Sequence, residues 1–169
     1  MPATSLALPS ESFTATAIAE LICEADGLPA EARLSVERKL RRLATGRQLH
    51  DGEQVTGRET WVYPAREIYR ARLFLEFARL GIDVGPAERA LSLATFSLGG
   101  AGLDAILEAA RASDGPMVLE VLTLPIEGNI GTTARVGAPS PLLPGERSRV
   151  TINVGQLVRD IDSVLAEGH

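Results

Sequence analysis

The residues best suited to chemistry in this sequence are cations, and they are concentrated in its middle. Residues 31–80 contain eleven Lys and Arg side chains against seven Asp and Glu, whereas the segments on either side are net acidic and the whole chain carries −5. Ten of the eleven cations are arginines, whose planar guanidinium groups suit phosphates and the hydrogen-bonding edges of bases. This pattern favours a contact with nucleic acid, although a solvated helix with internal ion pairs would carry the same charges.

Several of these cations share one face of a predicted helix that begins at about Ala30 or Ser35, runs to Ala44 and ends near Gly46. Its apolar residues recur at helical spacing and are expected to face inward; they are Leu34, Val36, Leu40 and Leu43. The other side carries Ser35, Arg38, Lys39 and Arg42, with Arg41 at its edge. A shorter helix, capped by Thr14 or Thr16, precedes it, and Gly27-Leu28-Pro29 breaks the chain between them. One packed face and one cationic face are typical of a DNA recognition helix, and also of surface helices in general.

Residues 48–63 predict a β-hairpin of the kind called a wing. Its strands are expected at 48–50 and 60–63, with turns at Asp51-Gly52 and Thr56-Gly57. Arg47 and Arg58 lie near the base and arm of this hairpin, where a wing meets the sugar-phosphate backbone. The other residues expected on the wing or beside it are Trp61, Tyr63 and Arg66, with His50 as a further possible phosphate donor.

A long helix is predicted to begin near Glu67 and to end at Leu80-Gly81. Its charged residues recur at spacings of three and four, at Arg72, Glu76, Arg79 and Asp83, and apolar residues occupy most of the remaining circumference. A helix with a single solvated strip must be buried against several neighbours. We therefore expect it to be the central helix of a small helical domain.

This order of elements resembles the winged helix-turn-helix domain of MerR-type transcription regulators. In that family a wing ends in an aromatic residue, and a helix with a row of Ile or Leu follows and is closed by Gly. Tyr63 matches the aromatic residue, Glu67-Ile68 the start of the helix, and Leu80-Gly81-Ile82 its end. The family usually has an Arg two residues before the aromatic; here that position is Trp61, and the nearest Arg is Arg58. The resemblance covers about the first half of the chain and implies DNA binding.

After Asp83 the sequence predicts helices over 86–98 and 103–112, joined by a glycine-rich connector, and its character then changes at Asp114-Gly115-Pro116. Strands are expected at 117–124, 132–136 and 147–154, a proline-rich loop at 137–145, and a final helix at 156–166. The expected fold class is α+β, with an N-terminal, mainly helical winged helix-turn-helix domain followed by a small C-terminal α+β unit. The expected divisions are a flexible tail (1–12), the winged helix-turn-helix domain with additional helices (13–112), and a dimerisation or partner-binding module (113–169).

The residues that catalysis or metal binding would need are not grouped in recognisable motifs. The chain has two histidines, one of them the last residue, and a single cysteine, Cys23, which excludes an internal disulfide. Neither an HExxH motif, nor a nucleophile elbow, nor a phosphate loop with its lysine is present. We therefore expect no enzyme activity, no metal and no cofactor.

Membrane-targeting signals are also missing from the sequence pattern. No stretch approaches the ~18 apolar residues of a membrane span, and the first residues lack a charged segment followed by an apolar run. A cytoplasmic location without a membrane partner is the expectation.

The first hypothesis is a sequence-specific DNA-binding transcription regulator that binds double-stranded DNA as a homodimer. Its expected DNA-binding residues are Ser35, Arg38, Lys39, Arg41, Arg42, Arg47, Arg58, Trp61, Tyr63 and Arg66. The alternatives are an excisionase-like or phage packaging DNA-binding protein, and a protein-interaction module such as an antiactivator. The C-terminal strands or last helix would form the dimer seam or receive a protein partner.

Overall fold

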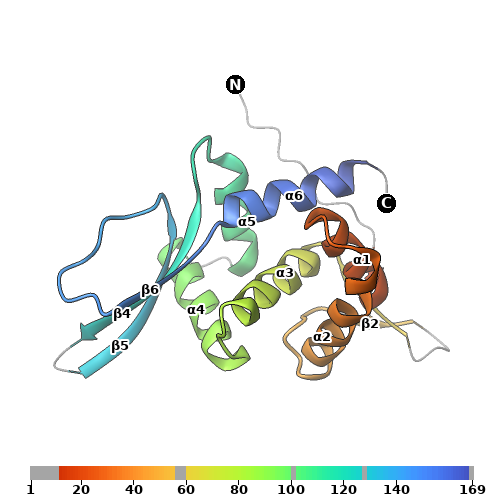
Figure 1. Ribbon diagram of the computed structural model, residues 1–169, viewed down its shortest axis with the longest axis horizontal. Helices are drawn as coiled ribbons and strands as arrows, with labels where there is room; N and C mark the ends of the chain where they lie inside the picture. The colour runs from red at the N-terminus through yellow and green to blue at the C-terminus, as the bar shows by residue number, and fades with distance from the viewer. Residues whose placement is uncertain (1–11, 56–59, 100–101, 127–128, 168–169) are drawn as a thin grey trace. The chain divides into compact units, whose positions relative to one another are not determined.

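The computed structural model describes residues 12–55, 60–99, 102–126 and 129–167, which form an α+β protein with two compact units (Figure 1). Unit 1 extends to Ala71 and unit 2 begins at Arg72. The division therefore falls inside a helix, rather than at the boundary expected after residue 112. The tail expected over residues 1–12 lies outside the described residues, except for Ser12, which belongs to a strand.

Unit 1 contains a pair of helices packed against each other. Helix α1 (Ala15–Ala25) starts where the Thr14 hydroxyl accepts a hydrogen bond from the Ala17 N–H at 3.2 Å. Helix α2 (Arg33–Thr45) follows a 3-10 turn, η1 (Ala30–Ala32), and packs on α1. Its buried residues are Val36, Leu40 and Leu43, as predicted. Leu34 was expected among them but is 60% exposed, because two residues rotate a helix by about 200° and place it on the side opposite Val36.

The sheet of unit 1 differs in part from the predicted hairpin. Strands β1 (Ser12–Thr14), β3 (Trp61–Pro64) and β2 (Glu53–Gln54) pair antiparallel in the order β1-β3-β2. The first strand of the hairpin thus lies at 53–54; residues 48–50, where it was predicted, form an irregular loop. Strand β1 was not predicted. The turn expected at Thr56-Gly57 lies outside the described residues.

Helix α3 (Arg66–Arg79) has the length and burial that its sequence predicts. Its fully or nearly fully buried apolar residues are Ile68, Tyr69, Ala71, Leu73, Phe74, Leu75 and Phe77. The solvated strip is held by Arg72 and Arg79, which both bind Glu76 Oε2, at 2.8 and 3.2 Å. Gly81 ends the helix in the left-handed conformation (φ +74°), which glycine adopts without strain.

Unit 2 contains a second antiparallel sheet, ordered β5-β4-β6 (Figure 1). Its central strand β4 (Val118–Ile126) pairs with β5 (Asn129–Gly137) and with β6 (Ser148–Ile152). Val121 of β4 lies opposite Ala134 on one side and Val150 on the other. The three predicted strands are confirmed, although Val154 belongs to the following helix instead of β6.

Three helices complete unit 2: α4 (Val84–Ser97), α5 (Gly102–Ala112) and α6 (Val154–Ala166). Helix α4 packs on β5 with a narrow buried face of Ala87, Ala90, Leu91 and Ala94. Helix α5 lies between α4 and α6, and Arg111 on α5 binds both carboxylate oxygens of Asp162 on α6, at 2.9 and 2.7 Å. Because α4 and α5 pack with the C-terminal elements, they belong to unit 2.

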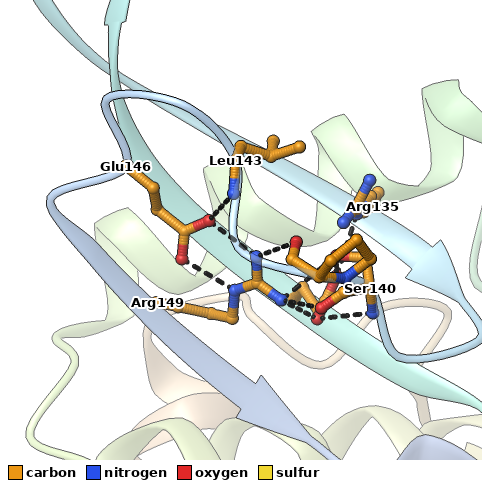
Figure 2. Close-up of polar contacts among 7 residues, drawn as sticks. Arg135, Ser140, Leu143, Glu146 and Arg149 are labelled. Atoms are coloured by element: carbon orange, nitrogen blue, oxygen red, sulfur yellow. Dashed lines mark hydrogen bonds and ion pairs between the residues drawn. The ribbon is translucent and has the colours of Figure 1, made fainter.

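The loop between β5 and β6, residues 138–147, is fixed to the sheet by Arg149 of β6 (Figure 2). We call it the clasp loop. The Arg149 guanidinium donates to Glu120 Oε1 at 2.7 Å, to the Ser140 carbonyl at 2.6 Å, and to the Pro141 carbonyl at 2.9 Å. It also binds both carboxylate oxygens of Glu146, at 2.8 and 2.6 Å. All of its hydrogen-bonding atoms are therefore used to hold one loop.

Glu120, at the centre of this network, is a buried charge on the central strand, with a residue exposure of 2%. It also accepts hydrogen bonds from Arg135 Nε at 2.9 Å and from the Ser140 hydroxyl at 2.8 Å. Burial alone would raise the pKa of Glu120, but these donors outweigh it and hold the pKa below its usual value. The carboxylate is thus ionised and paired.

No single helix of the described residues is long and apolar enough to cross a membrane. Among the described residues, the sharply bent pair α4 and α5 together reaches the required length and composition.

Candidate nucleic-acid interface

The outward face of α2 carries the cations that the sequence places there. Ser35, Arg38, Lys39 and Arg42 are all exposed, on the side away from the residues that pack on α1. Among the described residues, no hydrogen bond or ion pair involves the side chains of Arg38, Lys39 or Arg42. These three cations are therefore available to an external anion without the loss of an internal contact.

Arg41 differs from its neighbours because it is held within unit 1. Its Nε and Nη2 atoms donate to Glu37 Oε1 at 3.0 and 2.7 Å, and the Thr16 hydroxyl donates to the same oxygen at 3.1 Å. The hydrogen bonds from Arg41 and Thr16 outweigh burial and hold the pKa of Glu37 below its usual value. Since Arg41 would have to share or leave this carboxylate to contact DNA, it is a weaker candidate than Arg42.

The segment after α2 contains two residues in a backbone conformation that is rare outside glycine. Arg47 has φ +61° and Asp51 has φ +54°, both in the left-handed region. Hydrogen bonds from the N–H groups of Arg47 and Gln48 to the last carbonyls of α2, at Ala44 and Leu43, fix the turn. Strained residues of this kind are concentrated at functional sites. Here they turn the exposed Arg47 and His50 toward the same surface region.

This segment is anchored by Glu67, in the first turn of α3. Its side chain is fully buried, and Oε2 accepts a hydrogen bond from the backbone N–H of His50 at 2.7 Å. Arg70 Nε lies 3.1 Å from the same oxygen and supplies the compensating charge. Burial raises the pKa of Glu67, and the Arg70 charge and the His50 N–H only partly offset that rise.

Tyr63 was expected to contact DNA, but the structure places it in the support of the loop. Its exposed fraction is 6%, and its ring lies so close to Gly52 that an added Cβ there would be 2.4 Å from Cε1. Only glycine permits this approach. Burial, followed by the nearby Glu67 charge, raises the pKa of the Tyr63 hydroxyl. Tyr63 therefore packs the loop against β3, whereas Trp61, two positions before it on β3, is exposed.

The remaining residues predicted for the wing are in different situations. Trp61 is 49% exposed on β3. Arg66, at the start of α3, forms an ion pair with Asp51, so its charge is already partly used within unit 1. Arg58 lies outside the described residues.

A hollow of about 610 Å³ lies between the end of α2, the loop that follows it and strand β3. Its lining includes Thr45, Arg47, His50, Asp51, Trp61 and Tyr63. It thus combines a cation, an exposed aromatic ring and an imidazole next to the cationic face of α2. Those are the groups that receive a phosphate and the sugar or base attached to it.

Sequence reasoning did not find Glu67 and Gly52 as parts of this site. The signal for Glu67 was ambiguous, because an acid in the first turn of a helix is ordinarily explained by the helix dipole. No group of three or more potential metal ligands occurs among the described residues.

Comparison with models of known protein families, with curated proteins and with solved structures finds no match to this chain. Its function must therefore be inferred from its own residues.

Proposed function

We propose that unit 1 is a winged helix-turn-helix domain that binds double-stranded DNA, and that the protein is a sequence-specific transcription regulator. Helices α1 and α2 are the two helices of the motif, and β2 with β3 forms the wing. The observation that carries the proposal is the exposed face of α2, where Arg38, Lys39 and Arg42 have no partner among the described residues.

The spacing of these side chains suits a helix lying in the major groove. Arg38 and Arg42 are one turn apart on the same face, and Ser35 lies nearer the N-terminal end of α2. In helix-turn-helix proteins the N-terminal part of the second helix contacts base edges. Ser35 and Arg38 are accordingly assigned to bases, and Lys39 and Arg42 to bases or flanking phosphates.

The wing and the hollow supply the second contact. A phosphate at the hollow would meet the exposed Arg47, with Trp61 beside it. Here the chain departs from the MerR-type pattern, since Trp61 occupies the position of the family's usual arginine, and Arg47 is assigned the phosphate contact instead. Arg66, paired with Asp51, is assigned to orient the loop rather than to bind the backbone.

The test is binding to genomic fragments, including the region upstream of the protein's own gene, over a series of salt concentrations. The key variant is Arg38→Ala/Arg42→Ala, and its matched control is Arg147→Ala/Arg159→Ala, which removes two exposed arginines from unit 2. A plot of log K against log salt has a negative slope, and each lost phosphate contact makes this slope shallower by about 0.9. Because only Arg42 of this pair is assigned to a phosphate, we expect the α2 variant to lose up to about 0.9 of slope and at least about tenfold in affinity, while the control retains wild-type binding.

The three outcomes for the wild-type protein separate the candidate functions. Tight binding to a few fragments would support a regulator. Uniform binding would indicate an excisionase-like or packaging protein. Absence of binding at low salt, or an α2 variant that binds like wild type, would contradict the DNA-binding assignment and favour a protein-interaction module.

A further inference from the structure

The outward face of α4, in unit 2, has a stripe of exposed residues at helical spacing that nothing in the described chain covers. The stripe consists of Gly85, Arg89, Ser92 and Phe96, spaced by four, three and four residues. All four are exposed, and they lie opposite the residues that pack α4 on β5. Alternating steps of three and four are the spacing by which two helices form a continuous seam.

Both ends of this stripe have unusual exposure. Phe96 is 83% exposed, the highest value for a large apolar side chain in the described residues. At the other end, a Cβ built on Gly85 would have nothing within 4 Å, so open space lies above that backbone. The face thus has one projecting ring and one flat site, separated by eleven residues.

We propose that α4 is a self-association surface, on which α4 of a second copy packs antiparallel about a two-fold axis between residues 90 and 91. In a two-fold dimer the same patch serves both partners. That axis places Phe96 over Gly85 of the second copy, and Arg89 beside Ser92 of the second copy. The largest side chain of the face then meets the residue without one, and each contact occurs twice.

The charges on α4 favour a second copy over an unrelated partner. Glu88 and Arg89 are adjacent, yet neither forms an ion pair with a described residue. In the antiparallel pair, Arg89 is offset from Glu88 of the second copy by four residues along the axis, or about 6 Å. An extended arginine side chain can span this distance. The two copies exchange these ion pairs, so the seam is neutral.

The area available sets the strength of the association. Helix α4 has 14 residues and is about 21 Å long. One such helix pair buries less than the ~800 Å² per partner of a standard interface. The dimer is therefore concentration-dependent, and it uses α4 where the sequence had suggested the C-terminal strands or α6.

The first test is the molar mass of the full chain, measured by sedimentation equilibrium from the low micromolar range to several hundred micromolar. Phe96→Ser is compared with Leu142→Ser, which removes another highly exposed apolar side chain (78%), from the clasp loop. We expect wild type and Leu142→Ser to dimerise alike, and Phe96→Ser to need at least tenfold higher concentration. A monomer at every concentration, or a dimer that Phe96→Ser leaves unchanged, would overturn the proposal.

A charge exchange provides the second test. Arg89→Glu places an acid near Glu88 of the second copy and should weaken the dimer severalfold, whereas Glu88→Arg/Arg89→Glu restores the pair and should recover it. Equal association of both variants would contradict the proposed antiparallel register. Because the masses are measured without DNA, these results do not depend on whether unit 1 binds DNA.

Discussion

The loop that carries Arg47 and His50 depends on one buried carboxylate. Glu67 is inaccessible to solvent, accepts the His50 N–H and pairs with Arg70. Because water only partly replaces a lost partner in a part-buried site, removal of this carboxylate destabilises the positions of both the His50 N–H and the Arg70 guanidinium. Glu67 therefore determines the geometry of the proposed DNA-binding surface without contacting DNA itself.

Glu67→Ala is expected to lower the free energy of unfolding by about 3 kcal/mol and, through the displaced loop, to weaken the proposed DNA binding. Glu67→Gln is the matched variant, since its amide oxygen still accepts from His50 but does not neutralise Arg70; its loss should be smaller. Urea unfolding followed by circular dichroism gives the stability. If Glu67→Ala were as stable as Glu53→Ala, an exposed-site control on β2, the anchoring role would be wrong.

The pKa of Glu67 adds a pH dependence with a definite sign. Burial raises its folded-state pKa above the ordinary value of 4.5, so ionising it costs more in the folded chain than in the unfolded one. The stability gained by keeping it protonated is present below pH 4.5 and is lost as pH rises through the folded pKa. Glu67→Gln removes this contribution.

Which cations are available could be only partly predicted from the sequence. The exposed face of α2 follows from helical spacing, and the pairing of Arg41 follows from Glu37 four residues before it. The pairing of Arg66 with Asp51, fifteen residues apart, and the burial of Tyr63 over Gly52 depend on the path of an irregular loop. Local periodicity contains no information about such a path.

At the scale of elements, local periodicity was enough to predict the helices but not the shortest strands. All six α-helices of the described residues were anticipated from periodicity and end signals, because each has eleven or more residues over which a pattern repeats. Strands β1 and β2 have three and two residues, too few for a period. Their strand character is determined by their pairing with β3.

The clasp loop gives a prediction about acid stability. The hydrogen bonds from Arg149, then from the Leu143 N–H, lower the pKa of Glu146 from 4.5 to about 2. A carboxylate with a depressed folded pKa stabilises the fold above its unfolded pKa, and this contribution is lost as pH falls from about 4.5 to about 2. Wild type should therefore lose stability between pH 5 and pH 3 more steeply than Glu146→Gln, which lacks the titrating group.

Guanidinium unfolding at pH 7, 5 and 3 measures this difference, with the exposed Glu108→Gln on α5 as the control. The control should follow wild type. Parallel curves for wild type and Glu146→Gln would show that the clasp does not contribute to acid stability.

The whole molecule consists of two compact units that share one helix. The boundary between Ala71 and Arg72 lies within α3, so six residues of this helix belong to unit 1 and eight to unit 2. A helix is cooperative along its length. If either unit unfolded, part of α3 would be lost, and the other unit needs the remaining turns of that helix. We therefore predict a single unfolding transition for the whole chain.

Leu119→Ala tests this coupling. Leu119 is fully buried on β4 of unit 2, and its truncation should cost about 3 kcal/mol. Trp61, the only tryptophan, reports on unit 1, whereas far-UV circular dichroism reports on both units. In urea, we expect Leu119→Ala to shift the fluorescence and dichroism midpoints by the same amount. A Trp61 transition that stays at its wild-type midpoint while the dichroism midpoint falls would mean that unit 1 keeps its fold after unit 2 has unfolded, and that α3 does not couple them.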